Sequence, residues 1–206
     1  MERLIGVVGY ECEDITIYLA GILCALGKKT AIIDRTEQEM LCEMLGMQTN
    51  ENGAVKEREY CGIWITNKGI CTDDFDVVFY VFGYRTEHPK IYECEALLLI
   101  TDGVPAHASL LSRINNRECR RYLLIRNLVA LKHTVDYLVD RADDKAEYVE
   151  IPYDEKDVRE RCGLCGYGRI GIRQLSGGMK KALLELVKFL TDEYSQKEIR
   201  DVMKKM

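Results

Sequence analysis

The 206-residue sequence predicts one α/β domain over residues 1–206, a three-layer α/β/α fold with a doubly wound, mostly parallel sheet. Short continuous apolar runs, such as residues 77–82 (VVFYVF) and 96–101 (ALLLIT), have the length and composition of strands buried on both faces. These runs alternate with stretches of helical period. That order is typical of a parallel sheet covered by helices on both faces, in which ligands bind at the carboxyl ends of the strands.

The elements expected in the N-terminal half follow from this alternation and from the glycines that end helices. They are a strand at residues 4–8, a helix at 15–26 ended by Gly27, a strand at 30–33, a helix at 37–45 ended by Gly46, a polar surface loop at 48–58, and a hairpin that pairs 60–65 with 68–71 across Thr66-Asn67.

The C-terminal half continues the same alternation. Pro105 suits the first turn of a helix because the missing N–H has no helical acceptor there, and Ser176 is a favourable N-cap. The expected elements are strands at 77–82 and 96–101, a helix from Pro105 to residue 114, a strand at 121–125, a helix at 132–139, a strand at 147–151, a glycine-rich loop at 162–171, a helix from Ser176 to about residue 194, and a short helix or frayed tail at 196–206.

Composition narrows the classes of partner and compartment. The net charge of −5 argues against nucleic acid as a bulk electrostatic partner. No apolar run is long enough to cross a bilayer, and the N-terminus lacks the apolar stretch of a signal peptide, so we expect a cytoplasmic protein. The apolar side of residues 196–206 is small, so membrane contact is expected to be peripheral at most.

Most of the nine cysteines lie in apolar segments, where a reduced thiol acts as a small hydrophobic group. Cys162 and Cys165 form a CxxC pair, which suits a redox site or half of a zinc site. A second pair is absent from the sequence, and the segment is a late glycine-rich stretch, so we interpret the spacing as incidental. The LSGGM segment at 175–179 is interpreted as a capped helix start, not as a transporter signature.

The turn between the first strand and the first helix is acidic. A turn that binds phosphate needs glycines, free backbone N–H groups, a lysine and a hydroxyl group. The six residues here offer one glycine, no lysine and three carboxylates; they are Gly9, Tyr10, Glu11, Cys12, Glu13 and Asp14. Carboxylates in a first helical turn interact favourably with the helix dipole. We therefore expect one of these carboxylates to replace phosphate as the anion at the helix N-terminus.

The order of segments resembles the MinD/ParA family of deviant (SIMIBI-class) P-loop ATPases, which includes the CpaE/TadZ pilus-localisation proteins. The segments that resemble the family are residues 26–34 (LGKKTAIID), 40–46, 74–78 (DFDVV), 102–105 (DGVP), 124–127 (LIRN) and 149–154 (VEIPYD). The resemblance implies a P-loop NTPase-like fold. It also implies that Asp34 is the water-activating or switch carboxylate, that Asn127 contacts adenine, and that Pro152 and Tyr153 lie beside the base.

The chain departs from that family where the phosphates and magnesium would bind. Counted back from Gly27, Cys12 falls on the P-loop lysine, Glu13 on the magnesium-binding hydroxyl and Glu11 on the preceding glycine. The signature lysine has no counterpart, and the magnesium-side acid falls on Val81 or Phe82. A phosphate about 4 Å from one carboxylate is disfavoured by about 1–4 kcal/mol. The helix N-terminus offers only about 1 kcal/mol in return.

The sequence therefore predicts a non-catalytic MinD/ParA-like protein without catalytic residues, metal or cofactor. Its expected role is a scaffold or spatial regulator in bacterial localisation, pilus or secretion assembly, or division, acting on a protein partner or as a homodimer. The alternative is a nucleotide-binding ATPase or nucleotide sensor with a remodelled phosphate site, for which ATP and magnesium would be the cofactors. In that case Glu11, Glu13, Asp14 and Asp34 are the carboxylates that would recruit a cation.

Overall fold

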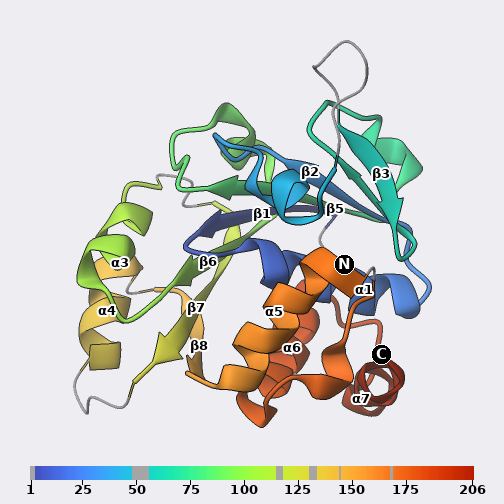
Figure 1. Cartoon of the computed structure of the whole chain (residues 1–206). Coiled ribbons are helices and arrows are strands. Elements are labelled where there is room, and N and C mark those ends of the chain that lie inside the picture. The colour runs from blue at the N-terminus through green and yellow to red at the C-terminus, as the bar shows by residue number, and fades with distance from the viewer. Residues whose placement is uncertain (1–2, 48–55, 115–117, 130–133, 144, 168) are drawn as a thin grey trace.

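The computed structural model describes residues 3–47, 56–114, 118–129, 134–143, 145–167 and 169–206. The described strands form an eight-stranded sheet in the order β3-β4-β2-β5-β1-β6-β7-β8 (Figure 1). Every neighbouring pair is parallel except β3 with β4. The strands are β1 (Leu4–Gly9), β2 (Thr30–Asp34), β3 (Glu57–Tyr60), β4 (Ile63–Thr66), β5 (Val77–Gly83), β6 (Ala96–Thr101), β7 (Arg120–Leu128) and β8 (Glu147–Pro152).

Helices cover both faces of the sheet, which confirms the predicted doubly wound α/β fold (Figure 1). Side chains of α1, α2, α6 and α7 share one apolar core with one face of the sheet, and α3 and α4 share a second core with the opposite face. The helices are α1 (Glu13–Ala25), α2 (Met40–Met44), α3 (Pro105–Leu111), α4 (Thr134–Ala142), α5 (Glu155–Tyr167), α6 (Gly177–Leu190) and α7 (Gln196–Lys205). None of the helices in the described ranges is long and apolar enough to cross a membrane.

The predicted hairpin was wrong in its strands and its turn, because residues 68–71 do not form a strand. The structure pairs β3 with β4 in antiparallel fashion, and the turn lies at Cys61 and Gly62 instead of Thr66-Asn67. Both turn residues have positive φ, 51° for Cys61 and 82° for Gly62. A glycine beside a second residue in this region makes the tight connection that a hairpin requires. Of the predicted surface loop at 48–58, residues 48–55 lie outside the described residues.

The predicted loop at residues 162–171 was also wrong, because α5 continues as a helix to Tyr167. Asp154 accepts a hydrogen bond from the backbone N–H of Lys156 (2.9 Å) ahead of this helix, and Glu155 and Asp157 lie in its first turn. Such acidic first turns favour a helix, and each internal glycine costs only about 1 kcal/mol. Cys162 is consequently an exposed helical residue.

The C-terminal segment is a packed helix and not a frayed tail. A capping box joins Ser195 and Glu198 at the start of α7. Ile199 and Met203 are buried in the core shared with α1 and α6. The other predicted elements lie where expected with shifted ends, and β7 is the most extended of them, since it runs three residues beyond the predicted 121–125 at its carboxyl end.

Candidate functional site: an acidic turn closed by two arginines

The acidic turn, defined as residues 9–14, joins β1 to α1 and is held by a close backbone contact. Gly9 has φ of 126°, and a Cβ atom there would lie only 1.8 Å from the carbonyl oxygen of Ile100. The next residue, Tyr10, donates its backbone N–H to that same oxygen at 2.9 Å. Only glycine fits this position, so β1 and β6 fix the start of the turn.

Arg126 closes the acidic turn from the end of β7. Its Nη1 and Nη2 lie 2.8 and 2.9 Å from the two carboxylate oxygens of Asp14, and Nη1 also donates to the carbonyl oxygen of Glu11. Arg126 is 3% exposed and Asp14 is 0% exposed. This is a buried, bidentate, charge-assisted pair. Burial alone would lower the pKa of Arg126, but the charge of Asp14 and its hydrogen bonds outweigh burial and raise it.

A bulge in β7 places this arginine. Ile125 pairs with Glu150 and Leu128 pairs with Pro152, so two residues of β7 oppose one residue of β8. Asn127, the second residue of the bulge, has φ of 58°. Asparagine tolerates this left-handed region better than most residues, and bulges commonly redirect a side chain next to a site. The bulge gives Asn127 a backbone role in holding Arg126 against the turn.

Arg161 of α5 makes a second contact with the acidic turn, an ion pair with the carboxylate of Glu11. Both side chains are about a quarter exposed, at 27% and 26%. Burial lowers the pKa of Arg161, while its hydrogen bond to Glu11 and the charge of Asp14 raise it to a net increase. Glu11 itself has φ of 45°, a region that favours glycine. The backbone therefore adopts a glycine-like conformation at the position where the resemblance places a glycine.

Cys12 and Glu13 lie between these contacts and are both buried. Cys12 occupies the position of the expected P-loop lysine, and burial together with the nearby Glu13 raises its thiol pKa well above the ordinary value. Glu13 is 7% exposed, and burial raises its carboxyl pKa, although a bond to its own backbone N–H partly opposes the shift. Neither group offers a cation to a phosphate or an activated nucleophile.

A cavity of about 370 Å³ opens above the acidic turn. Its lining mixes acidic, basic and aromatic side chains from the ends of β1, β2 and β5, and comprises Gly9, Tyr10, Glu11, Glu13, Thr36, Glu37, Gln38, Met40, Phe82, Gly83, Tyr84, Arg85 and Arg161. The two arginines are already engaged, because Arg161 pairs with Glu11 and Arg85 donates to the carbonyl oxygen of Arg35 at 2.9 Å.

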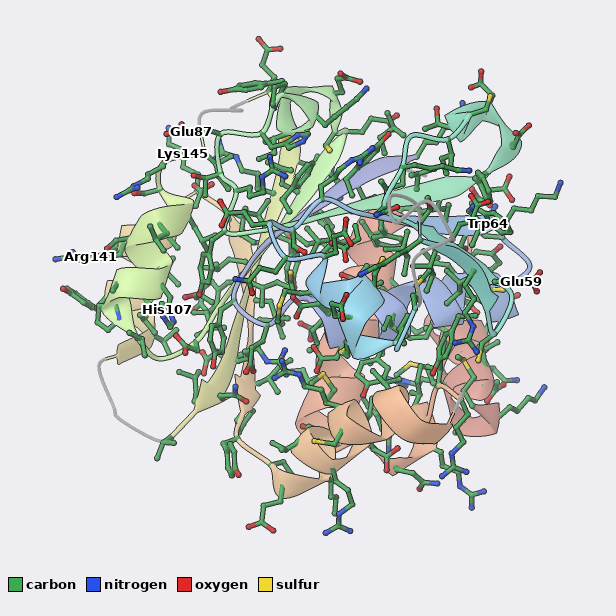
Figure 2. All side chains as sticks on the ribbon, turned by 45° about the horizontal axis from the view of Figure 1, so that its top comes forward. Glu59, Trp64, Glu87, His107, Arg141 and Lys145 are labelled. Atoms are coloured by element: carbon green, nitrogen blue, oxygen red, sulfur yellow. The ribbon has the colours of Figure 1, made fainter. Side chains whose placement is uncertain are left out.

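An aromatic cluster borders this cavity. Tyr10 stacks on the imidazole of His107, with ring centroids 4.9 Å apart, and Tyr84 lies 5.7 Å from the same ring. His107 belongs to α3 and is labelled in Figure 2. Its Nδ1 lies 2.8 Å from Oδ1 of Asp102, which also accepts the backbone N–H of Val104. The cluster thus ties the tyrosine of the acidic turn to the loop after β6.

Four other predicted site residues do not line the cavity: Asp34, Asn127, Pro152 and Tyr153. Asp34 is 2% exposed and accepts hydrogen bonds from the backbone N–H and hydroxyl of Thr36 and from the backbone N–H of Cys42. Its carboxylate therefore closes the loop between β2 and α2. Pro152 is the last residue of β8, and Tyr153, which follows it, is 52% exposed. Val81 and Phe82, at the position of the magnesium-side acid, are fully buried.

Sequence reasoning missed the two arginines that matter most at this site. Arg126 carried one detectable signal, since it ends an apolar strand and a buried cation there requires an anionic partner. Arg161 carried none, because no element was predicted between the strand at 147–151 and the loop at 162–171. Within the described residues, no group of three or more histidine, cysteine or carboxylate side chains is arranged to hold a metal ion.

Comparison with known proteins identifies solved structures that share the fold of this chain. No model of a protein family and no curated protein matches the chain. The solved structure of a ParA family ATPase from Chlorobium tepidum TLS is similar, with a TM-score of 0.65 at 13% identity, over 92% of this chain and 99% of that one.

Two further solved structures have the same arrangement of elements. Apo McdA from Cyanothece aligns with a TM-score of 0.61 at 10% identity, over 98% of this chain and 99% of that one. Cobyrinic acid a,c-diamide synthase from Mycobacterium smegmatis aligns with a TM-score of 0.60 at 15% identity, over 92% and 94%. The chain therefore has the α/β fold of ParA- and McdA-type P-loop ATPases.

Proposed function

We propose that this protein is a non-catalytic member of the ParA-type fold that acts as a scaffold or spatial regulator through contacts with a protein partner or with a second copy of itself. The observation that carries the proposal is the buried Asp14–Arg126 pair. It puts an internal carboxylate, with its own counter-cation, at the helix end where a phosphate would bind.

The charges of the acidic turn support this proposal. Three carboxylates and no lysine lie in the turn that would hold a triphosphate, and a carboxylate disfavours a phosphate about 4 Å away by about 1–4 kcal/mol. The two nearby arginines are already bonded to the turn. A phosphate that recruited Arg126 would leave the fully buried Asp14 without its cation, which typically costs about 3–5 kcal/mol.

Calorimetry with ATP and ADP, each with magnesium, tests the proposal. We expect no saturable binding up to millimolar nucleotide. Micromolar affinity of the native chain, or ATP hydrolysis that is abolished by Asp34→Ala, contradicts it.

A gain-of-function variant identifies the cause. Glu11→Gly, Cys12→Lys and Glu13→Thr together restore the glycine, lysine and hydroxyl that the turn lacks, and Gly suits the φ of 45° at residue 11. Nucleotide binding by this variant, with none by the native chain, attributes the loss to these positions. The single change Glu11→Gly is the matched control, since it relieves the backbone and removes a carboxylate without adding a cation.

One observation favours a second candidate, a nucleotide-binding protein or sensor with a remodelled phosphate site. The cavity of about 370 Å³ has two tyrosines, Tyr10 and Tyr84, on which a base can stack. This candidate predicts that a nucleoside raises the melting temperature of the native chain and that Tyr84→Ala removes the effect. A melting temperature unchanged by adenosine, guanosine and their phosphates favours the scaffold.

A further inference from the structure

A basic groove lies between α6 and α7, away from the acidic turn. It has a volume of about 520 Å³ and is lined by five cationic and two apolar side chains: Arg173, Lys180, Lys181, Leu184, Arg200, Met203 and Lys204. No carboxylate is part of this lining, although the chain as a whole carries a net charge of −5. The groove therefore has a positive local charge that attracts anionic ligands, although the protein as a whole is acidic.

The helical sequences build the groove from two rims and a floor. The rim of α6 comes from its first half, at Lys180 and Lys181, and the rim of α7 comes from Arg200 at its middle and Lys204 near its end. Leu184, one turn after Lys180, and Met203 contribute the apolar floor.

The cations of the groove are only partly used within the chain. Lys180 donates to the carbonyl oxygen of Arg173 (2.9 Å), while Lys181 and Lys204 lie 3.7 and 3.3 Å from carboxylates on their own helices. Exposed pairs of this kind contribute little stability. The guanidinium groups of Arg173 and Arg200 make no ion pair with any described residue. Two exposed arginines therefore flank an apolar floor without internal partners.

The side chains that line the groove also indicate which class of anionic ligand it suits. It contains no aromatic side chain, so a nucleic acid base has nothing on which to stack. Leu184 and Met203 are only 7% and 6% exposed, so they lie recessed and do not protrude as a membrane-inserting face would. A recessed apolar floor between cationic rims instead suits an apolar side chain that protrudes from an acidic segment.

We propose that this groove docks an acidic amphipathic helix of a partner protein. An apolar side chain of that helix contacts Leu184 and Met203, and its flanking carboxylates pair with Arg173 and Arg200. Helices commonly bind grooves in this way, and arginines are enriched among the residues that dominate interface energies. The inference specifies the partner of the scaffold role and in that respect rests on it, yet the groove is separate from the nucleotide-fold site.

A synthetic peptide tests the groove directly. The probe is a fluorescently labelled amphipathic helix of about 14 residues, near the length at which isolated helices become stable, with leucines on one face and glutamates elsewhere. Fluorescence anisotropy at low salt should show saturable binding to the native chain. The charge-reversal variant Arg173→Glu with Arg200→Glu should bind at least about tenfold more weakly, as expected when anchoring residues are lost.

The matched control reverses the same amount of charge on α6 and α7 outside the groove, by Lys188→Glu and Lys197→Glu, both exposed positions. This control should bind the peptide as the native chain does. Equal losses in the two variants would mean attraction to net charge only and would overturn the proposal. A second peptide with serine in place of leucine should bind more weakly. Equal affinity of the two peptides would show that the apolar floor does not contribute to binding.

Two further outcomes overturn the proposal in favour of another ligand. Co-sedimentation of the native chain, but not of the charge-reversal variant, with phosphatidylcholine vesicles containing phosphatidylglycerol would assign the groove to a lipid surface if the peptide fails to compete. Absence of saturable peptide binding would reject a helical partner. Neither result depends on ATP binding, so failure here and failure of the scaffold proposal are distinguishable.

Discussion

The acidic turn and the basic groove use charge in opposite ways. In the acidic turn each buried or half-buried charge of Asp14, Arg126, Glu11 and Arg161 has an internal partner. In the basic groove Arg173 and Arg200 are exposed and have no ion pair among the described residues. Satisfied charges hold a fold together, whereas unsatisfied exposed charges are available to a ligand. We therefore expect the acidic turn to contribute to stability and the basic groove to contribute to the proposed recognition of a partner.

The largest expected effect comes from breaking the buried pair. Arg126→Met leaves the carboxylate of Asp14 without a counter-ion, so the free energy of unfolding should fall by about 3–5 kcal/mol in urea denaturation followed by circular dichroism. Arg161→Gln removes the partly exposed partner of Glu11 and should cost only about 0.2–1 kcal/mol.

A double variant separates the pair from the packing around it. Arg126→Met with Asp14→Leu removes both charges and should recover much of the stability lost by Arg126→Met alone, because no unpaired ion stays buried. If Arg126→Met cost no more than Arg161→Gln, the buried pair would not be the structural element that the geometry indicates.

The fold was predictable because it follows from local patterns. Continuous apolar runs such as β5 and β6 signal buried parallel strands, and helix signals between them give the alternation. The position of the hairpin turn was not predictable, since it depended on which residues adopt positive φ, here Cys61 and Gly62. The extent of α5 was missed because its glycines suggested a loop, while the acidic first turn that favours the helix was overlooked.

The candidate site was predictable only in part. The composition of the acidic turn predicted that a carboxylate would lie at the helix N-terminus in place of a phosphate, and Asp14 is the buried carboxylate that pairs with Arg126 there. Its partner depended on the bulge at Arg126 and Asn127, which is a tertiary feature with no sequence period. Sequence reasoning left Glu11, Glu13 and Asp14 as candidates for the anion of the pair and had no means to assign its cation.

The next largest effect should come from the start of the acidic turn. Gly9→Ala places a Cβ atom 1.8 Å from the carbonyl oxygen of Ile100 at φ of 126°, so β1 and β6 must separate. We expect a loss of at least about 2 kcal/mol in the same denaturation assay. Gly103→Ala is the matched control, because nothing lies within 4 Å of its added Cβ. An equal effect of the two changes would mean that the turn is not fixed by this contact.

A smaller, pH-dependent effect should come from Glu13. Burial raises its pKa in the folded state, so its protonated form is favoured by folding and its contribution to stability is lost as pH rises through the folded pKa. Glu13→Gln cannot ionise. It should therefore be more stable than the native chain near pH 7, by less than about 1 kcal/mol.

The pH dependence of the free energy of unfolding of that variant tests whether the pKa of Glu13 is raised in the folded state. The difference between Glu13→Gln and the native chain should vanish below the ordinary glutamate pKa of about 4.3, where both side chains are neutral. Urea denaturation at a series of pH values measures it. If the native chain were instead more stable than Glu13→Gln near pH 7 and lost that advantage as the pH fell, folding would favour the ionised carboxylate, and Glu13 would belong with the satisfied charges of the acidic turn.

The smallest effect is expected in the basic groove, where it is the most informative. Arg173→Gln and Arg200→Gln, alone or together, should change the free energy of unfolding by less than about 0.5 kcal/mol, because neither guanidinium has an internal ion pair to lose. The same double variant should bind the acidic helical peptide more weakly than the native chain. If these arginines instead supported stability as Arg126 does, their charge would belong to the fold, and the division between a structural turn and a recognition groove would fail.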